Sequence, residues 1–152
     1  MSASTRGPAA PPRVVVADDD GSLREALRDM LVSFGLEVVG QAADGRDAIV
    51  VTEATGPDVV LMDLRMPVMG GLEATEQIKR SMPDVHVIAL TAYEDEGLQR
   101  AATKAGVDAY LLKGCEPRLI VEVVQRACAP AKETAGDPPE HRPGARGEDP
   151  GR

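Results

Sequence analysis

Aromatic side chains and cysteines are scarce in this chain of 152 residues. Tryptophan is absent, aromatic residues make up 2% of the sequence, and hydrophobic residues nevertheless reach 43%. A hydrophobic core must therefore be built from aliphatic side chains. The two cysteines, Cys115 and Cys128, have neither metal-ligand spacing nor a companion pair. We expect them to be reduced thiols that fill partly buried positions in a cytosolic protein.

Long apolar runs and an excess of positive charge are also missing. No run approaches the roughly 18 apolar residues that suggest a membrane span, and the N-terminus lacks the basic-then-apolar pattern of a secretory signal. The formal net charge is −8 at pH 7, which does not suit the binding of nucleic-acid phosphates. We therefore expect a cytoplasmic protein with no membrane partner and no DNA binding by this chain.

The two ends of the chain differ in composition from its middle. Residues 1–12 are small, polar and proline-rich, and residues 130–152 are rich in proline, glycine and charge. Such segments cannot bury enough apolar surface to offset the entropy lost on ordering. We predict a disordered leader over residues 1–12, one folded domain over residues 13–129 and a disordered tail over residues 130–152.

Apolar runs typical of strands alternate five times with helical patterns inside the predicted domain. The predicted strands cover residues 14–17, 37–42, 58–62, 85–90 and 109–112. Apolar residues with helical spacing follow each strand, and the last helix is predicted to begin near Pro117 and to bury Leu119, Ile120, Val123, Val124 and Ala127. Five such units predict an α/β, three-layer, doubly wound (βα)5 domain with a parallel sheet in the flavodoxin-like order 2-1-3-4-5.

Polar side chains follow four of these strands at the point where each strand ends. They are Asp18 and Asp19 after the first strand, Asp63 after the third, Thr91 after the fourth and Lys113 after the fifth. Ligands of open α/β sheets bind beyond the carboxyl ends of the strands, so we expect these groups to converge. Three neighbouring carboxylates repel one another unless a cation neutralises them. Because Mg²⁺ prefers a few carboxylates together with water and phosphate oxygens, the pattern predicts a site for Mg²⁺ and a phosphoryl group.

Each of these side chains can be given a role in phosphoryl transfer, which needs positioning and charge neutralisation above all. Asp63 ends the central strand and can act as a nucleophile that becomes an aspartyl phosphate. Asp19 would bind Mg²⁺, and Asp18 would support it directly or through water. Lys113 would offset negative charge, and Thr91 would hydrogen-bond a phosphoryl oxygen. Any one of these residues could instead be a helix cap or a solvated charge, so the prediction rests on their occurrence together.

Four motifs carry these residues: VVVADD at 14–19, LMDLRMP at 61–67, ALTA at 89–92 and AYLLK at 109–113. With these motifs the chain resembles the receiver domain of two-component response regulators over residues 13–129, which implies a CheY-like fold. The second and fourth motifs are most similar to the subfamily that carries a LuxR-type helix-turn-helix domain. No helical pattern or basic face follows Ala129. The chain would be either a free-standing receiver, which the composition of the tail favours, or the receiver part of a transcription factor whose DNA-binding domain was lost or cut off.

The resemblance implies a phosphoacceptor in a two-component phosphorelay. Asp63 would accept phosphate from a phosphohistidine of a sensor histidine kinase. Asp18, Asp19 and Asp63, together with the backbone carbonyl of Arg65, would bind Mg²⁺. The protein would not be an enzyme in the usual sense, because it would catalyse only its own phosphorylation and dephosphorylation.

The resemblance also implies how phosphorylation would be transmitted. Thr91 and Tyr110 would be the switch pair: Thr91 moves to the phosphate and Tyr110 turns inward behind it. The face made by the fourth helix, the fifth strand and the fifth helix would change and bind an unknown output protein or a second copy of the chain. Arg65 and Tyr93 would flank the path of the attacking water and tune the lifetime of the phosphorylated state.

Two other functions use the same residues. In a haloacid-dehalogenase-like phosphatase, Asp18 would be the nucleophile and Asp20 the general acid, but no later acidic pair is present and Asp63 would have no role. In the second alternative, the domain keeps the receiver fold as a protein-interaction module that is never phosphorylated. Both alternatives remain open at the level of the sequence.

Overall fold

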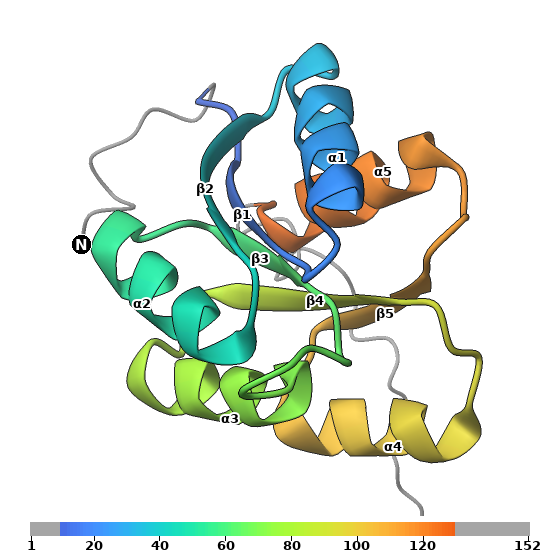
Figure 1. The fold of residues 1–152 in the computed structure, drawn as a ribbon. Coiled ribbons are helices and arrows are strands. Elements are labelled where there is room, and N and C mark those ends of the chain that lie inside the picture. The colour runs from blue at the N-terminus through green and yellow to red at the C-terminus, as the bar shows by residue number, and fades with distance from the viewer. Residues whose placement is uncertain (1–9, 130–152) are drawn as a thin grey trace, which may run out of the picture.

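Ten secondary-structure elements alternate along residues 10–129, the part of the chain described by the computed structural model (Figure 1). The strands are β1 (Arg13–Ala17), β2 (Glu37–Ala42), β3 (Val59–Met62), β4 (His86–Thr91) and β5 (Ala109–Leu112). The helices are α1 (Gly21–Ser33), α2 (Gly45–Thr55), α3 (Gly71–Ser81), α4 (Glu96–Ala105) and α5 (Pro117–Ala127). All five predicted βα units are confirmed, and their strand bounds agree within one residue. Residues 1–9 and 130–152 lie outside the described range, so the disordered leader and tail stay predictions.

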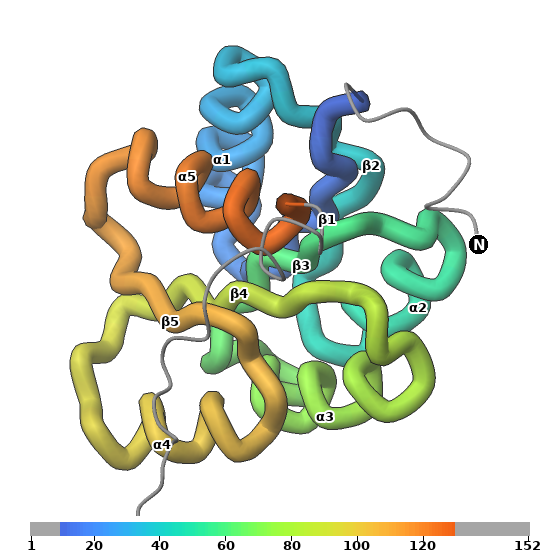
Figure 2. The backbone as a smooth tube through the Cα atoms, turned by 180° about the vertical axis from the view of Figure 1, so that it is seen from behind, coloured from blue at the N-terminus to red at the C-terminus, as the bar shows by residue number. Residues whose placement is uncertain are grey.

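The five strands form one parallel sheet in the order β2-β1-β3-β4-β5. Helices α1 and α5 cover one face of the sheet, and α2, α3 and α4 cover the other (Figures 1 and 2). This arrangement confirms the predicted three-layer, flavodoxin-like fold. It also places the carboxyl ends of β1 and β3 next to each other at the middle of the sheet, with the end of β4 beside β3.

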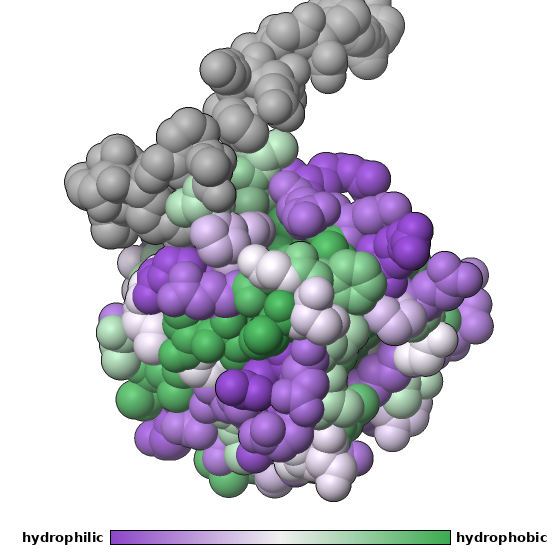
Figure 3. Space-filling model, turned by 90° about the horizontal axis from the view of Figure 1, so that it is seen from above, coloured by the Kyte–Doolittle hydropathy of each residue, from purple (hydrophilic) through white to green (hydrophobic). Residues whose placement is uncertain are grey.

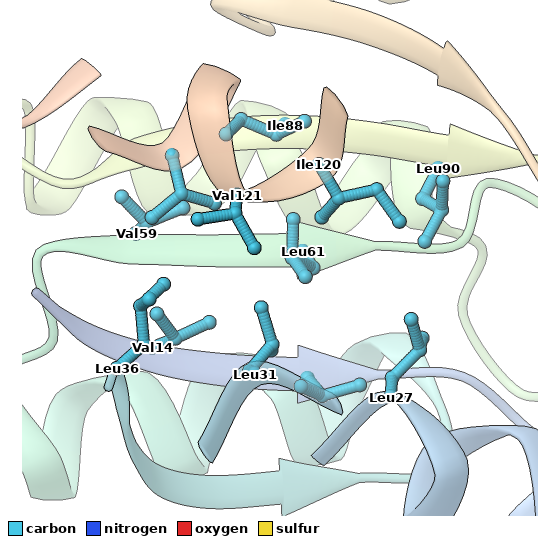
Figure 4. Close-up of a cluster of buried hydrophobic side chains, with 12 residues drawn as sticks. Val14, Leu27, Leu31, Leu36, Val59, Leu61, Ile88, Leu90, Ile120 and Val121 are labelled. Carbon is cyan, nitrogen blue, oxygen red and sulfur yellow. The ribbon is translucent and has the colours of Figure 1, made fainter. Parts of the chain in front are cut away.

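The core consists of aliphatic side chains on both faces of the sheet. Along β1, Val14 and Val16 pack toward α1 and α5, whereas Val15 and Ala17 pack toward α2 and α3. Figure 4 shows the first of these clusters, in which leucines of α1 and the Ile120–Val121 pair of α5 meet the central strands. Because the inner strands are buried on both sides, their sequences are continuous apolar runs rather than alternating ones.

Capping residues set the ends of α2 and α4. The Asp44 carboxylate accepts a hydrogen bond from Asp47 N at the start of α2, and Asp95 accepts one from Leu98 N at the start of α4. Gly56 and Gly106 end the same two helices with φ of 59° and 111°. Glycine is favoured there because a side chain is strained in that left-handed region.

The buried face of α5 differs from the prediction at two positions. Leu119 was expected to be buried but is 40% exposed, whereas Val121, which was not in the predicted set, is buried. The residues of α5 that are buried against the sheet are Ile120, Val121 and Val124. The helix is therefore rotated about its axis relative to the orientation that the apolar spacing predicted. Within residues 10–129, no helix combines the length and apolar character needed to cross a membrane.

Candidate functional site

The polar residues predicted at the strand ends do come together at the carboxyl edge of the sheet. Asp18 and Asp63 directly follow β1 and β3, Lys113 follows β5, and Thr91 is the last residue of β4 rather than the first one after it. Backbone hydrogen bonds join the ends of neighbouring strands: Asp63 N donates to Ala17 O at 2.9 Å, and Lys113 N donates to Thr91 O at 2.7 Å. The sheet register therefore holds the groups in a fixed arrangement.

Three carboxylates form an acidic cluster at the centre of this edge. Asp18 and Asp63 are 2% and 5% exposed, whereas Asp19 is exposed. One oxygen from each of the three lies within 4.8 Å of the others. Two buried carboxylates and a third at the surface leave negative charge that a hard divalent cation can neutralise, with a position open to solvent for water or phosphate. The donor set therefore fits Mg²⁺.

The Lys113 ammonium lies between the two buried carboxylates. Its Nζ is 2.7 Å from Asp18 Oδ2 and 3.3 Å from Asp63 Oδ2. Burial raises the pKa of Asp63, the nearby Lys113 charge lowers it, and the Asp18 charge raises it again, with a net upward shift. Burial alone would lower the pKa of Lys113, but its hydrogen bond to Asp18 and the charge of Asp63 raise it overall. The lysine is therefore held in its charged form.

Every polar atom of Asp18 is held by a partner. Its N–H donates to Ala42 O at 2.9 Å, and its carbonyl oxygen accepts from Arg24 Nη1 at 2.7 Å. Oδ1 accepts from Asp20 N at 2.8 Å, which leaves Oδ2 to face Lys113. The sequence analysis did not single out Arg24. The only signal was a basic residue one turn into the helix that follows the acidic pair.

The loop between Asp63 and α3 packs backbone against backbone. A side chain at Gly71 would overlap the carbonyl oxygen of Asp63, and one at Gly45, the first residue of α2, would overlap the carbonyl oxygen of Met69. Glycine is therefore required at both positions by close approach. Val68 in the same loop has φ of 68° and is 76% exposed. This strained valine was not predicted, because nothing in its neighbours marks a left-handed residue.

The predicted switch residues are linked through Tyr93. Thr91 is completely buried, and its hydroxyl oxygen accepts a hydrogen bond from Tyr93 N at 3.4 Å. The Tyr110 hydroxyl donates to the Tyr93 carbonyl oxygen at 2.7 Å. Burial, together with the charge of Asp95, raises the pKa of Tyr110 against the opposing effect of Arg65, so the hydroxyl keeps its proton and remains a donor at neutral pH.

The two predicted tuning residues touch each other. The Arg65 guanidinium carbon lies 4.4 Å from the centroid of the Tyr93 ring, which is a cation–π contact. Arg65 N also approaches Asp63 Oδ1 at 3.4 Å. The loops after β3 and β4 are thus connected by a side-chain contact beside the acidic cluster. The role of the Arg65 carbonyl as a metal ligand stays a prediction.

An apolar cavity of about 280 Å³ lies between α1 and α5 and reaches Lys113. Figure 3 shows this side of the molecule, where hydrophobic surface is flanked by hydrophilic side chains. The wall includes Leu23 of α1, Pro117 of α5 and Cys115. Apolar packing around the Lys113 stem leaves the lysine side chain 21% exposed and directs its charged end toward the carboxylates. Cys115 and Cys128 are partly buried against the aliphatic core, as predicted.

Comparison with known proteins identifies the family. Residues 14–125 match the response regulator receiver domain. The chain is 42% identical over 114 residues to the uncharacterized transcriptional regulatory protein YhcZ of Bacillus subtilis, covering 74% of this chain and 53% of YhcZ. It is 38% identical over 118 residues to the response regulator GacA of Pseudomonas aeruginosa, covering 77% of this chain and 55% of GacA.

Solved structures agree with this assignment. The receiver domain of the putative response regulator NarL from Mycobacterium tuberculosis has a TM-score of 0.73 at 32% identity, covering 76% of this chain and 94% of that one. A LuxR-family response regulator from Aurantimonas has a TM-score of 0.73 at 30% identity, covering 76% and 84%. The chain therefore belongs to the response regulator receiver domain family. It spans about half the length of the curated relatives that it matches.

The phosphatase alternative fits the structure poorly. Its general acid would be Asp20, but the Asp20 carboxylate accepts hydrogen bonds from Ser22 N and Leu23 N and serves as the N-cap of α1. Asp63, which has no role in that scheme, is instead buried, with its carboxylate 3.3 Å from the Lys113 ammonium and beside those of Asp18 and Asp19. The family match and these contacts both favour a receiver.

Proposed function

We propose that this chain is a Mg²⁺-dependent phosphoacceptor switch in a two-component phosphorelay, with Asp63 as the residue that is phosphorylated. The observation that carries the proposal is the position of Lys113 Nζ, 2.7 Å from Asp18 and 3.3 Å from Asp63, beside a third carboxylate. A buried carboxylate with a fixed ammonium and a metal-binding cluster can accept a phosphoryl group without further covalent chemistry from the protein.

The reaction requires one bond to form and one to break. An oxygen of Asp63 forms the new P–O bond while the P–N bond to the imidazole of a sensor histidine kinase breaks, and the imidazole nitrogen keeps the electron pair and takes up a proton. Lys113 compensates negative charge near the new acyl phosphate, and the Thr91 hydroxyl donates to a phosphoryl oxygen. The chemistry that Mg²⁺ would supply when bound by Asp18, Asp19, Asp63 and the Arg65 carbonyl is neutralisation of charge on the phosphoryl oxygens.

The output would follow from the contacts of Tyr93. If Thr91 turns toward a phosphoryl oxygen, its hydroxyl no longer accepts the hydrogen bond from Tyr93 N. The backbone of Tyr93 would then shift, and with it the carbonyl oxygen that accepts a hydrogen bond from the Tyr110 hydroxyl. Phosphorylation would thereby bias a pre-existing equilibrium of the α4–β5–α5 face. That face would bind an output protein or a second copy of the chain, without DNA binding by this chain.

Arg65 and Tyr93 would tune the lifetime of the acyl phosphate, because their stacked side chains lie on the loops that flank Asp63. The protein would be phosphorylated in the cytoplasm, since a sensor kinase draws its phosphate from ATP. The alternative that the domain binds partners without being phosphorylated is decided by the experiment that follows.

The test is the intact mass of the protein after incubation with Mg²⁺ and a small acyl-phosphate donor. We expect one added phosphoryl group in the wild type, none with EDTA and none in Asp63→Asn. Asp29→Asn, which alters an exposed carboxylate on α1, is the matched control and should be phosphorylated normally. An adduct that persists in Asp63→Asn but disappears in Asp18→Asn would revive the phosphatase assignment. No adduct in the wild type under any donor would support the unphosphorylated module.

A second measurement reports on the switch. Tyr93 and Tyr110 are the only tyrosines, and the chain has no tryptophan, so intrinsic fluorescence comes from the proposed output path. In Tyr93→Phe, Tyr110 becomes the single reporter, and its emission should change when the donor and Mg²⁺ are added. The same change should be absent in a Tyr93→Phe protein that also carries Asp63→Asn.

A further inference from the structure

We propose that Arg24 is a positioning residue for the metal site: its guanidinium holds the loop between β1 and α1 in the arrangement that allows Asp18 and Asp19 to bind a divalent cation. This inference rests on the proposed Mg²⁺ site. Arg24 is partly buried near the start of α1. Its hydrogen bonds in the described part of the chain go to a side-chain amide and a backbone carbonyl, not to the carboxylates of the acidic cluster. It acts on the backbone that carries them.

The guanidinium joins three elements at one point. Nη1 donates to the carbonyl oxygen of Asp18 at 2.7 Å, at the end of β1, and Nε donates to Oε1 of Gln41 on β2 at 3.0 Å. Gln41 is itself oriented, because its Nε2 donates to Glu25 Oε2 at 3.2 Å. The donors of a guanidinium lie in one rigid plane, so two simultaneous acceptors fix both the position and the direction of the group.

The consequence for Asp18 is that its peptide plane cannot rotate freely. The carbonyl held by Arg24 belongs to the peptide group that joins Asp18 to Asp19, the exposed member of the cluster. Rotation of that peptide would move both carboxylates relative to Asp63. Partners that orient metal ligands in this way typically change metal affinity by about 10–100-fold when they are removed.

Charge and positioning predict opposite results, which makes the inference testable. Arg24 brings a positive charge close to the cluster, so by Coulomb repulsion alone its removal should strengthen Mg²⁺ binding. If its hydrogen bonds matter more, removal should weaken binding. Weaker binding in a variant that has lost a positive charge cannot be explained by electrostatics.

The experiment is titration with Mg²⁺ at constant ionic strength, without a phosphate donor, followed by calorimetry or by NMR shifts of the residues at the strand ends. We expect Arg24→Met to raise the Kd about 10-fold. Arg24→Lys should bind with intermediate affinity, because an ammonium can reach one acceptor but cannot reproduce the planar pair. Arg28→Met removes the same charge one turn further along α1, where the side chain pairs with Asp29, and should leave the Kd unchanged or slightly lower.

A second variant covers the case in which Arg24→Met does not fold, as judged by urea unfolding in EDTA. Gln41→Leu keeps the arginine and its charge but removes one of its two acceptors, and we expect a smaller rise in the Kd. An unchanged or lower Kd in Arg24→Met would overturn the inference, and so would an unchanged Kd in Gln41→Leu if only that variant folds. A wild type that binds no Mg²⁺ at millimolar concentrations would reject the proposed metal site itself, and the inference with it.

Discussion

Replacement of Lys113 by methionine should make the stability of the protein depend strongly on pH and on Mg²⁺. Methionine keeps most of the apolar stem that packs beside the cavity between α1 and α5 but removes the ammonium. Asp18 and Asp63, both nearly inaccessible to solvent, then face each other without the cation that lies 2.7 Å and 3.3 Å from them.

The size of the effect follows from these distances. At an effective dielectric constant of about 20, opposite charges separated by this much attract by roughly 5–6 kcal/mol, and desolvation of the three groups offsets much of it. Breaking a fully buried ion pair by removing one partner costs about 3–5 kcal/mol. Because Lys113 keeps 21% of its exposure, we expect a loss of about 2–3 kcal/mol at pH 7 in EDTA, a large share of the roughly 5–15 kcal/mol typical of a domain.

The sign of the pH dependence can be derived from Asp63. Its pKa in the folded protein is raised above the ordinary 3.8, chiefly by burial, and Lys113 counteracts the rise. A carboxyl with a raised pKa opposes folding when it is ionised, so stability increases as the pH falls through the folded pKa toward 3.8. Without Lys113 the pKa of Asp63 should rise further, and the protein should then gain more stability on acidification. Lys113 itself, with its pKa raised above 10.5, stabilises the wild type at all pH values below that.

The assay is urea unfolding followed by far-UV circular dichroism between pH 7 and about pH 4.5, with EDTA or excess Mg²⁺. The difference in unfolding free energy between wild type and Lys113→Met should become smaller on acidification. It should also become smaller on addition of Mg²⁺, which at the proposed site would bind only the folded state. Lys79→Met is the control, because Lys79 is exposed to the same extent, at 22%, and pairs with Asp108 at the opposite edge of the sheet. The unfolding free energy lost in Lys79→Met should not change when Mg²⁺ is added. A loss below about 1 kcal/mol for Lys113→Met, or one independent of both pH and Mg²⁺, would refute the reasoning.

Two more predictions concern the loops around Asp63. Arg65→Ala and Tyr93→Ala should alter the decay rate of the phosphorylated protein non-additively, because each substitution removes the same cation–π contact. We expect a coupling free energy of about 0.5–1 kcal/mol between the two substitutions. Strictly additive rate changes in the double variant would show that the contact is irrelevant to the decay. Gly71→Ala should lower the unfolding free energy by about 1–3 kcal/mol and slow phosphorylation, because its methyl group would displace the Asp63 carbonyl; wild-type stability and phosphorylation rate would contradict the packing argument.

The arrangement of the sheet was predictable because burial on both faces leaves a strong pattern in the sequence. The inner strand β3 is completely apolar, β1 is apolar after its first residue Arg13, and each is followed at once by an aspartate. The parallel order then brings the strand ends together without any assumption about side chains. The predictions of Asp18, Asp19, Asp63, Thr91 and Lys113 as neighbours thus required only the strand ends and the topology.

The features that were missed depend on how elements pack rather than on where they begin. Leu119 has the spacing of a buried residue, yet the rotation of α5 against the sheet leaves it exposed. The bonds of Arg24 depend on its reach across two neighbouring elements, and the stack of Arg65 on Tyr93 depends on the shapes of two loops. Side chains this long can adopt many directions in the unfolded chain, and periodicity contains no information about which one is selected.

The contacts around Asp18 indicate why the proposed metal site would need more than its ligands. Lys113 lies against two of the three carboxylates, so its ammonium neutralises part of the charge that a bound divalent cation would also neutralise. Arg24 adds a second positive charge close by, which by electrostatics alone disfavours metal binding. Its hydrogen bond to the Asp18 carbonyl is useful to the site only if the order it imposes outweighs that repulsion. The Mg²⁺ affinities of the Arg24 and Lys113 variants should therefore change in opposite directions: lower without the arginine, higher without the lysine.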